Sequence, residues 1–509
     1  MTQDFRSGDV LELDIEKLTC GGRGLARLEG RAVFVERGLP GQLVRARLSK
    51  LAKRHAEAAT VEVLRSSPEQ IEPFCPHYAD CGGCDWQDLD YAAQLRWKRQ
   101  IVAESLRHIG RQSGESGQSG QDVQNLVDET TPSPLLRGFR NKMEFAFAGQ
   151  EPHVGLRSWR DPRRVLDVTD CGLMAEPAMD VLAAVRELSR ASGATAYDPV
   201  SGRGVWRFLV LRDSRPAGEK GVRAGEGRCP SPDLTPPGRD DALDPRGLLP
   251  ECQGAAELTS AAGLQAILIT GPGSEAVKQA EAVAQGLLVR FPGLRVAHGV
   301  RRDKAAVAYA EEIVRSWGDP VLEMSLGELR YRLSPQAFFQ TNTAGAERLF
   351  GLVEVMAGLA DWPNGAEVFD CYCGVGAMAL RLAHAAGHVT GFELVEGAVR
   401  DATDNARLNN PANCSFVAGD LRHTLADRKL PKPDVLVIDP PRAGMHPDVA
   451  ARILDLAPAR IVSVSCDPAT FARDAALLLP GYELVRVVPV DLFPHSHHVE
   501  TVALLVRRS

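Results

Sequence analysis

The sequence predicts a multidomain α/β protein with an N-terminal OB-like β-barrel, an α+β middle domain and a C-terminal Rossmann-like, doubly wound domain. Three observations lead to this prediction. Short strand-like runs separated by glycine and proline turns fill roughly the first 65 residues. Strand-like and helical runs alternate over roughly the last 170 residues, and the region between mixes both patterns. At 509 residues the chain is long enough for several domains.

We expect the three domains to span residues 1–68, 69–330 and 331–509. Two stretches interrupt the middle domain without any hydrophobic period. Residues 112–124 are rich in Gly, Ser and Gln, and residues 214–257 are rich in Pro, Gly, Asp and Arg. Such compositions cannot bury enough apolar surface to fold, so both stretches are expected to be disordered insertions.

The composition is that of an ordinary globular protein, with 44% hydrophobic and 25% charged residues. No apolar run approaches the roughly 20 residues that span a bilayer, and the N-terminus has no signal pattern. We therefore expect a cytoplasmic, monomeric protein without a membrane partner. The net charge of −7 argues only weakly against a nucleic-acid partner, because the local patch that meets the phosphates decides binding.

The N-terminal domain is expected to be an RNA-binding barrel. Its strand-like runs are residues 10–15, 32–35, 43–48 and 59–63. Barrels of the oligonucleotide-binding type commonly bind RNA, and a basic rim would contact the phosphates. The candidate rim consists of Arg45, Arg47, Lys50, Lys53, Arg54 and His55. A solvated charged loop explains any one of these residues equally well.

Three strand-like runs of the C-terminal domain end in residues suited to chemistry. Residues 367–370 lead into a Gly-x-Gly turn, residues 434–438 lead into Asp439, and residues 460–464 lead to Cys466. The carboxyl ends of the strands form the ligand crevice in open α/β sheets. We therefore expect the glycine turn, the carboxylate and the thiol to belong to one site that combines a cofactor with a nucleophile.

The cofactor is predicted to be S-adenosylmethionine. Gly374 and Gly376 permit close backbone approach, and Glu393, seventeen residues further on, has nearly the spacing at which a carboxylate meets ribose hydroxyls. Asp420 follows the next strand, residues 414–418. The loop lacks a third phosphate-binding glycine and the Lys and Ser/Thr of a P-loop. S-adenosylmethionine therefore fits better than NAD or ATP.

A cysteine cluster with metal-ligand spacing lies in the middle domain. Five residues separate Cys75 from Cys81, and two separate Cys81 from Cys84. The intervening glycines allow tight turns that let several thiolates converge. Cys171, which is followed by a glycine, is the best candidate for a fourth ligand. Four thiolates suit zinc or an iron–sulfur cluster, and spacing does not decide between them; unrelated buried cysteines remain the alternative, chiefly for Cys171.

At this point the sequence resembles the RNA 5-methyluridine (uracil-5-) methyltransferase family over nearly the whole chain. Four motifs carry the resemblance: Phe338-Phe339-Gln340-Thr341-Asn342, Asp439-Pro440-Pro441-Arg442, Ser465-Cys466-Asp467-Pro468 and Pro494-His495-Ser496-His497-His498-Val499-Glu500. The resemblance implies that the barrel is a TRAM domain and that the C-terminal domain is a class I S-adenosylmethionine-dependent methyltransferase domain. It also implies a 4Fe–4S cluster on Cys75, Cys81, Cys84 and Cys171.

The same resemblance assigns roles to single residues. It implies that Cys466 is the nucleophile and Glu500 the general base, and that the cofactor site is lined by Gln340, Tyr372, Glu393, Asp420 and Asp439. Two positions depart from the family pattern. Tyr372 stands where the aromatic is often Phe, and Ala377 stands where several relatives have Asn, so Ala377 is left out of the cofactor site.

The chemistry explains why such an enzyme needs a cysteine. Carbon 5 of uracil is a poor nucleophile, and a thiolate that attacks carbon 6 turns the ring into an enolate whose carbon 5 is reactive. A general base must then remove the carbon 5 proton before the thiolate leaves. The target base has to leave the helical stack, which costs least in an RNA loop. The implied substrate is structured RNA, with 23S rRNA favoured by the barrel and the cluster, and tRNA as the alternative.

Two other classes of function compete with this reading. The first is a non-catalytic RNA-binding or redox-sensing iron–sulfur protein whose methyltransferase fold is degenerate. The second is an amino-group methyltransferase, whose Asp-Pro-Pro motif is normally followed by an aromatic residue rather than by Arg442. Cys371 and Cys373 are alternative candidates for the nucleophile. Without the neighbouring motifs, Cys466 could equally be a buried structural thiol. His495, His497 and His498 could suggest a metal site but lack an obvious partner cluster.

Overall fold

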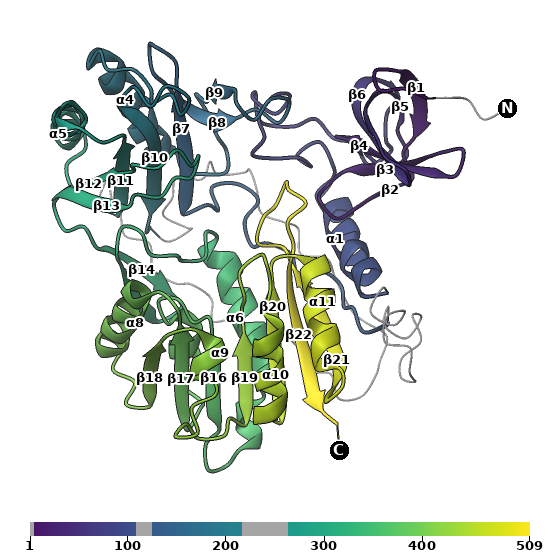
Figure 1. The fold of residues 1–509 in the computed structure, drawn as a ribbon, viewed down its shortest axis with the longest axis vertical. Coiled ribbons are helices and arrows are strands. Elements are labelled where there is room, and N and C mark those ends of the chain that lie inside the picture. The colour runs from purple at the N-terminus through teal and green to yellow at the C-terminus, as the bar shows by residue number, and fades with distance from the viewer. Residues whose placement is uncertain (1–4, 108–124, 216–262, 509) are drawn as a thin grey trace.

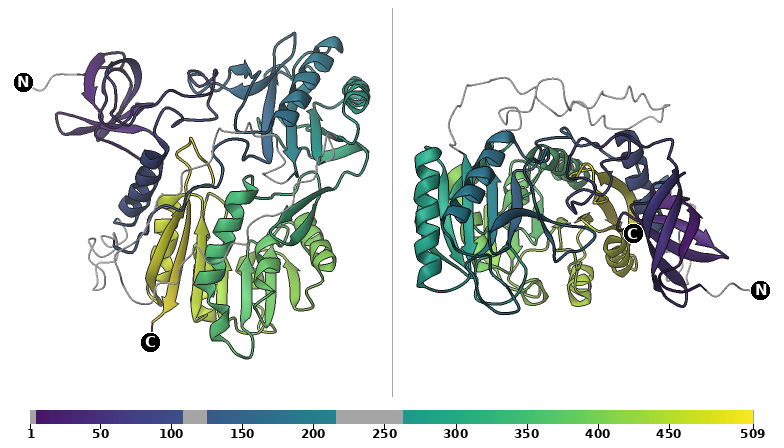
Figure 2. Two further views of the ribbon diagram at one scale, coloured as in Figure 1. Left: turned by 180° about the vertical axis from the view of Figure 1, so that it is seen from behind. Right: turned by 90° about the horizontal axis from the view of Figure 1, so that it is seen from above.

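The computed structural model describes residues 5–107, 125–215 and 263–508, which form three bodies (Figure 1). The barrel and the middle domain lie side by side above the C-terminal sheet, and views from behind and from above show the same arrangement (Figure 2). The insertion expected at 112–124 lies outside the described residues, as does the insertion at 214–257 apart from Ser214 and Arg215. Arg215 is buried and pairs with Asp213 at 2.8 Å.

The N-terminal barrel is one six-stranded sheet with the strand order β1-β5-β6-β4-β3-β2. Its strands are β1 (Val10–Asp14), β2 (Lys17–Leu18), β3 (Gly24–Leu28), β4 (Arg31–Glu36), β5 (Leu43–Leu51) and β6 (His55–Arg65). Alternate residues of these strands, such as Val33, Val35 and Val44, form an apolar interior. Strands β2 and β3 were not expected from the sequence, because a glycine-rich turn and several polar residues interrupt their apolar pattern.

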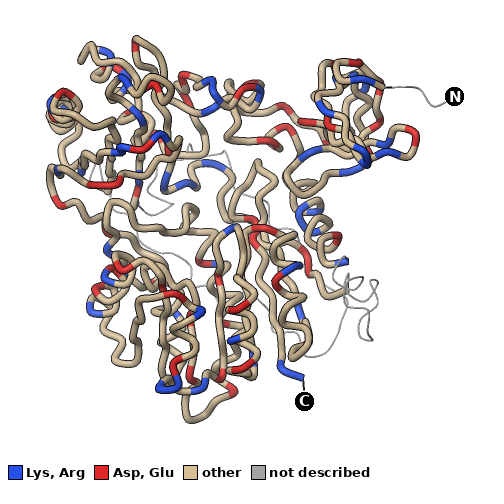
Figure 3. Tube along the Cα trace, in the orientation of Figure 1, with Lys and Arg blue, Asp and Glu red and all other residues tan. Residues whose placement is uncertain are grey.

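Much of the predicted basic rim is balanced by acidic neighbours. Arg45 pairs with Glu62 at 2.9 Å, and Lys50 pairs with Glu57 at 3.2 Å. Figure 3 shows basic and acidic residues interspersed over all three bodies. Exposed pairs of this kind are weak, so RNA phosphates can compete for these cations.

The middle domain is built on a seven-stranded sheet with the order β13-β12-β11-β10-β7-β8-β9. Its strands are β7 (Lys142–Ala148), β8 (His153–Arg157), β9 (Val165–Asp167), β10 (Trp206–Asp213), β11 (Leu264–Thr270), β12 (Arg295–Val300) and β13 (Glu312–Trp317). Helices α4 (Glu176–Ala191) and α5 (Ser274–Arg290) bury their apolar stripes in one core with this sheet.

The C-terminal domain is a doubly wound sheet with the order β18-β17-β16-β19-β20-β22-β21. Its strands are β16 (Glu367–Cys371), β17 (His388–Glu393), β18 (Cys414–Ala418), β19 (Val435–Ile438), β20 (Arg460–Ser465), β21 (Tyr482–Val490) and β22 (Glu500–Arg507). The first five strands in this order are parallel, and β22 runs antiparallel to both of its neighbours.

Helices cover both faces of this sheet. One face packs against α6 (Thr343–Ala357), α7 (Ala377–Leu382) and α8 (Glu396–Asn409). The other face packs against α10 (Pro447–Leu456), α11 (Pro468–Leu478) and the short α9 (Leu421–Thr424). Strands buried on both sides read as continuous apolar runs, which is why residues 435–438 are all buried.

Two segments that lie partly or wholly outside residues 331–509 also pack on the C-terminal domain. The hairpin of β14 (Leu322–Leu326) and β15 (Leu329–Leu333), which the expected boundary at 330 divides, lies in the same core as α6 and α7. Helix α1 (Tyr91–Leu106) packs on the opposite face with Val102 and Leu106. The part of the chain expected to be one middle domain therefore supplies elements to the C-terminal domain.

Within the described ranges, no helix is long and apolar enough to cross a membrane.

Candidate active site and cysteine centre

The turn after β16 has the backbone geometry of a nucleoside-binding loop. Gly374 and Gly376 have φ values of 54° and 80°, in the left-handed region that favours glycine. A Cβ on Gly376 would lie 2.8 Å from the Phe416 ring, so only glycine fits there. Tyr372 also adopts a left-handed φ of 66°, which is uncommon for a bulky residue and marks this turn as functional.

Glu393 at the end of β17 is oriented by the same turn. One carboxylate oxygen accepts a hydrogen bond from the Gly374 backbone N–H at 3.1 Å, and the other accepts one from Val395 at 2.8 Å. Each oxygen keeps a lone pair for a further donor. This fixed carboxylate can accept hydrogen bonds from two vicinal hydroxyls, as a ribose would offer.

Asp420 begins α9 and is held differently. Its carboxylate accepts a hydrogen bond from the Arg422 backbone N–H and pairs with the Arg422 guanidinium at 2.6 Å, which lowers the pKa of Asp420 to about 2. Asp420 is therefore ionised under all ordinary conditions and presents an acceptor at the end of β18.

The Gln340 segment connects the middle domain to this crevice. The Gln340 carbonyl accepts a hydrogen bond from the Asn141 side chain at 2.8 Å, and Asn342 caps the N-terminus of α6. Phe339 is buried against Tyr331, whose hydroxyl donates to the carbonyl of Ala377 behind the glycine turn. The Phe-Gln-x-Asn motif is thus linked through Tyr331 to the helix that follows the glycine turn.

Cys466 and Glu500 meet because of the register between β20 and β22. Ser465 is the Cα partner of Thr501 in this antiparallel pair, so the next step along each strand brings Cys466 opposite Glu500. Strand β22 also pairs with β21, so it lies between β20 and β21. Asp439, at the end of the neighbouring β19, completes the group.

Burial raises the pKa of all three groups, and neighbouring charges add to the shifts at Cys466 and Glu500. Burial, together with the negative charges of Glu500 and Asp439, raises the pKa of Cys466 to about 11. Burial and then Asp439 raise the pKa of Glu500 to about 8, and burial raises the pKa of Asp439 to about 6. Arg442 opposes these shifts at both Cys466 and Glu500. Strong shifts of this kind, clustered at strand ends, are typical of active sites.

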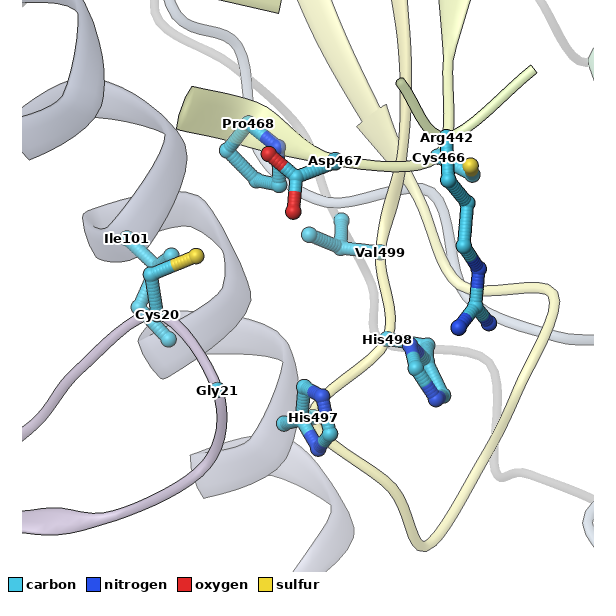
Figure 4. A pocket seen from close by; sticks show the side chains of 10 residues that line it. All are labelled: Cys20, Gly21, Ile101, Arg442, Cys466, Asp467, Pro468, His497, His498 and Val499. Atoms are coloured by element: carbon cyan, nitrogen blue, oxygen red, sulfur yellow. The ribbon is translucent and has the colours of Figure 1, made fainter. Parts of the chain in front are cut away.

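A pocket of about 230 Å³ opens at Cys466. The C-terminal domain lines it with Arg442, Cys466, Asp467, Pro468, His497, His498 and Val499. Cys20 and Gly21 of the barrel and Ile101 of α1 complete the wall (Figure 4). The pocket is smaller than those that bury drug-sized ligands, and its size suits a single nucleobase. The three residues from outside the C-terminal domain were missed in the sequence, where only the glycine-rich turn at 21–24 hinted at them.

The rival nucleophiles lie elsewhere. Cys371 is fully buried in the core, and Cys373 is buried behind the glycine turn against Gly391. Burial raises the pKa of both thiols well above its usual range. Neither lines the pocket, whereas Cys466 does.

The histidines near the C-terminus hold neighbouring segments together around the pocket. The His495 ring bonds the carbonyl of Leu136 at 2.9 Å, and His497 faces the carboxylate of Asp85. Burial and the neighbouring cations lower the pKa of His498 to about 3, so this pocket residue is neutral at physiological pH.

The four cysteines of the predicted centre are brought to one region. Cys81 and Cys171 are buried, and burial together with the charges of Cys75 and Cys81 raises the pKa of Cys171 to about 12. The pKa of Cys84 is raised by burial and by all three other thiols. Two N–H donors already face these sulfurs, from the backbone of Gly83 at 3.4 Å and from the side chain of Gln87 at 3.7 Å.

Within the described residues, no group of three or more His, Cys, Asp or Glu side chains is gathered closely enough to hold a metal ion. A positively charged side chain nevertheless lies beside the four cysteines. Arg140 is buried beside Cys84 and Cys171, and its Nε has no hydrogen-bond partner in the structure. An unsatisfied buried donor next to several thiols is a site that a negatively charged group would complete.

The sheet order, the glycine turn and the acidic residues at successive strand ends define the C-terminal domain as an S-adenosylmethionine-dependent methyltransferase of class I. Comparison with known proteins narrows this class. Residues 300–508 match the family described as tRNA (Uracil-5-)-methyltransferase, and residues 4–61 match the TRAM domain. The chain belongs to the RNA (uracil-5-)-methyltransferase family.

Relatives match over nearly the whole length. An RNA methyltransferase of Nitratidesulfovibrio vulgaris is 42% identical, with 99% of this chain and 97% of the relative covered. One of Gloeobacter violaceus is 34% identical, with 98% and 97% covered. The solved structure of Pyrococcus abyssi tRNA (uracil-54, C5)-methyltransferase in complex with S-adenosyl-L-homocysteine aligns with a TM-score of 0.69 at 25% identity, and covers 97% of this chain and 100% of that chain.

Proposed function

We propose that this enzyme methylates carbon 5 of a specific uridine in structured RNA through a covalent bond between Cys466 and carbon 6 of the base. The observation that carries the proposal is the juxtaposition of Cys466 and Glu500 across β20 and β22, at the rim of a base-sized pocket. An amino-group methyltransferase would need neither a thiol nor a proton acceptor in this position.

The steps balance on the residues present. The Cys466 thiol loses its proton to solvent, its sulfur bonds carbon 6, and the electron pair of the C5–C6 double bond forms the C5–methyl bond as the bond between the methyl group and its donor breaks. Glu500 then takes the carbon 5 proton, and the electrons left on carbon 5 re-form the double bond as the carbon 6–sulfur bond breaks. S-adenosylmethionine, when bound, would supply the methyl group as an electrophile and would leave as neutral S-adenosylhomocysteine, which keeps the electron pair of the broken methyl–sulfur bond.

Both residues must ionise before they act in this way. With pKa values of about 11 and about 8, Cys466 and Glu500 are mostly protonated at neutral pH in the unliganded protein. A cation lowers both values, and Arg442 is the fixed cation at the pocket. The positive sulfonium of the methyl donor would be a second cation. The Cys466 thiolate would therefore form when the donor is bound.

We further propose that Gln340, Tyr372, Gly374, Gly376, Glu393, Asp420 and Asp439 form the donor site. The open glycine turn, the oriented Glu393 and the ionised Asp420 suit an adenosine, which presents ribose hydroxyls and an amino group. Asp439 lies between this site and Cys466, where a carboxylate can attract the positively charged part of the donor.

The four cysteines are proposed to hold a 4Fe–4S cluster. A single zinc ion requires all four sulfurs about 2.3 Å from one point. A cluster is a larger body whose four thiolates need not meet at one point, and the charges of the other three thiols reach Cys84. The Gly83 and Gln87 donors and the buried Arg140 would stabilise its negative charge. Iron analysis of anaerobically purified protein, and its loss in a Cys84→Ser variant, test this assignment.

The RNA is proposed to be 23S rRNA, in the cytoplasm, with tRNA as the alternative that the name of the Pyrococcus abyssi relative suggests. The test is methyl transfer from labelled S-adenosylmethionine to unmodified 23S rRNA and, separately, to tRNA, with the product nucleoside identified by mass spectrometry. 5-Methyluridine in rRNA alone supports both parts of the proposal. Label in tRNA alone keeps the chemistry and overturns the substrate, and no label in either RNA overturns both.

A further inference from the structure

The β2–β3 turn of the barrel, residues 19–23, borders the catalytic pocket directly. Cys20 and Gly21 line the pocket, and Figure 4 shows the Cys20 side chain across it from Cys466 and Arg442. A Cβ placed on Gly21 would meet no atom within 4 Å, so the turn faces open space there. The wall opposite the nucleophile therefore comes from a different domain.

The turn is closed by its own hydrogen bonds. The backbone N–H of Gly22 donates to the carbonyl of Thr19 at 2.9 Å, and the N–H and hydroxyl of Thr19 both bond the carbonyl of Arg23. Gly21 and Gly22 have φ values of 87° and 80°, which such a tight turn requires. These hydrogen bonds within the turn fix the position of the Cys20 side chain.

The turn is also fixed to the rest of the protein. The buried Trp86 donates its indole N–H to the carbonyl of Gly22 at 3.1 Å. A Cβ on Gly22 would clash with the side chains of Asp85 and His497, so only glycine lets the turn lie this close to them. Just before the turn, Lys17 pairs with Glu104 of α1 at 2.6 Å, and Leu18 is buried against Trp86.

The Cys20 thiol faces the loop that carries the nucleophile. Its neighbours on that side are the carboxylate of Asp467 and the backbone N–H of Ala469, one and three residues after Cys466. The side chain is small and exposed, so it leaves space in the pocket rather than filling it. A uracil whose carbon 6 reaches the Cys466 sulfur must then enter between the nucleophile loop and this turn.

We propose that the barrel turn at residues 19–22 is a specificity-determining wall of the catalytic pocket, with Cys20 in contact with the flipped-out nucleotide. The inference rests on the proposed RNA-methylating function. In this proposal the barrel helps to select the nucleotide, in addition to any contact with the surrounding RNA. The reason is that the pocket is complete only when the barrel is in place.

The test is a Cys20→Trp variant, whose indole fills the space beside the turn. We expect kcat/KM for RNA to fall at least about 10-fold, as for other small misplacements at a reaction centre. The dissociation constant for S-adenosylmethionine is expected to stay within about twofold, because the donor residues lie on other strand ends. Unchanged kcat/KM for RNA in a folded Cys20→Trp variant would overturn the proposal.

Ser66→Trp is the matched control. Ser66 is a small, exposed residue just after β6, outside both the pocket and the candidate basic rim, so the same bulk there should leave kcat/KM unchanged. An equal loss in both variants would assign the effect to the barrel as a whole and also overturn the proposal. The wild-type enzyme must form 5-methyluridine in the same assay, which separates a failure of this inference from a failure of the proposed function.

A second measurement needs no variant. The rate of Cys20 alkylation by iodoacetamide is followed by peptide mass spectrometry on the full-length protein. Saturating substrate RNA should slow the reaction at least about fivefold, because burial of a thiol in an interface removes its access to the reagent. S-adenosylhomocysteine alone should not slow it. An alkylation rate that RNA leaves unchanged would contradict the contact.

Discussion

At the scale of single residues, the unliganded site keeps the Cys466 nucleophile in its protonated, unreactive form. Cys466 has a pKa of about 11 because it is buried beside two carboxylates, and Arg442 only partly offsets them. Such a thiol resists oxidation and stray alkylation, since the thiolate is the reactive form. The same carboxylates would attract a cationic methyl donor, so binding of the donor and activation of the thiol are linked.

This link predicts a difference between two ligands of nearly the same shape. Alkylation of Cys466 at pH 8 should be several-fold faster with S-adenosylmethionine bound than with S-adenosylhomocysteine bound, because only the former carries a positive sulfonium that favours the thiolate. The measurement is the rate of modification of the Cys466 peptide at saturating ligand. Equal rates would show that the sulfonium does not act on the thiol.

Glu500 predicts a pH dependence of stability. Its pKa of about 8 in the folded protein lies above the ordinary value of 4.5, so the folded state holds the proton more tightly and loses stability as pH rises from 4.5 to 8. Glu500→Gln removes this loss. The melting temperature of the variant minus that of wild type should be larger at pH 8.5 than at pH 5. Methyl transfer by the variant should fall by at least about 100-fold. A melting difference that is the same at both pH values would contradict the assigned shift.

At the residue scale, the predictions came from short motifs. Asp439, Cys466 and Glu500 each follow or begin an apolar run, and a strand end carries its side chain to the crevice of an open sheet. The Cys20 wall was not predictable, because nothing in a Thr-Cys-Gly-Gly turn indicates which domain it will face. Its position depends on long-range packing of Trp86 and α1, which local sequence does not encode.

At the scale of elements, the arrangement of the glycine turn on Phe416 and α8 sets the donor site. Gly376→Ala should weaken S-adenosylmethionine binding about 10-fold, because a left-handed alanine costs about 1–2 kcal/mol and its Cβ would press on the Phe416 ring. Titration calorimetry measures the effect.

Gly351→Ala on α6 is the control for this prediction, since a Cβ there meets no atom within 4 Å. It should stabilise the helix slightly and leave binding unchanged. Equal affinities of all three proteins would show that the glycine turn does not contact the donor.

Helix α1 is joined to the strand-to-loop transition before Glu500 by a fully buried ion pair. Lys98 and Asp491 lie 2.6 Å apart with no exposed side-chain surface, and the Tyr91 hydroxyl also donates to Asp491. Lys98→Met should cost about 3–5 kcal/mol in the free energy of unfolding, because it leaves a buried carboxylate uncompensated. Urea denaturation measures the loss.

The double variant Lys98→Met/Asp491→Asn separates charge from packing. The amide keeps an acceptor for Tyr91 but removes the unpaired charge, so it should recover part of the stability lost in Lys98→Met. A double variant less stable than the single one would mean that the cost comes from lost packing at Lys98 instead.

At the scale of the whole molecule, the pocket is an assembly of three parts of the chain. The barrel supplies the Cys20 turn, α1 supplies Ile101, and the C-terminal sheet supplies the chemistry (Figures 1 and 4). Arg37 of the barrel strengthens this assembly, since it donates to the carbonyls of Tyr78, Cys81 and Cys84. The cysteine loop is therefore placed to hold the barrel over the active site.

The sequence predicted the kinds of domain but not how they share elements. Alternating strands and helices indicated the doubly wound sheet, and residues 434–438 and 460–464 were expected as strands. The insertion of β22 between β20 and β21, and the packing of α1 on the C-terminal core, are non-local pairings. Periodicity reports which face of a segment is buried and not which partner buries it.

The most direct test of the covalent mechanism uses substrate RNA in which the target uridine is replaced by 5-fluorouridine. Fluorine at carbon 5 leaves Glu500 no proton to remove, so after methyl transfer the bond between Cys466 and carbon 6 cannot break. We predict a stable protein–RNA complex whose cross-linked peptide contains Cys466 and which a Cys466→Ala variant does not form. Turnover without a trapped complex, or a cross-link to Cys20, Cys371 or Cys373, would contradict the mechanism.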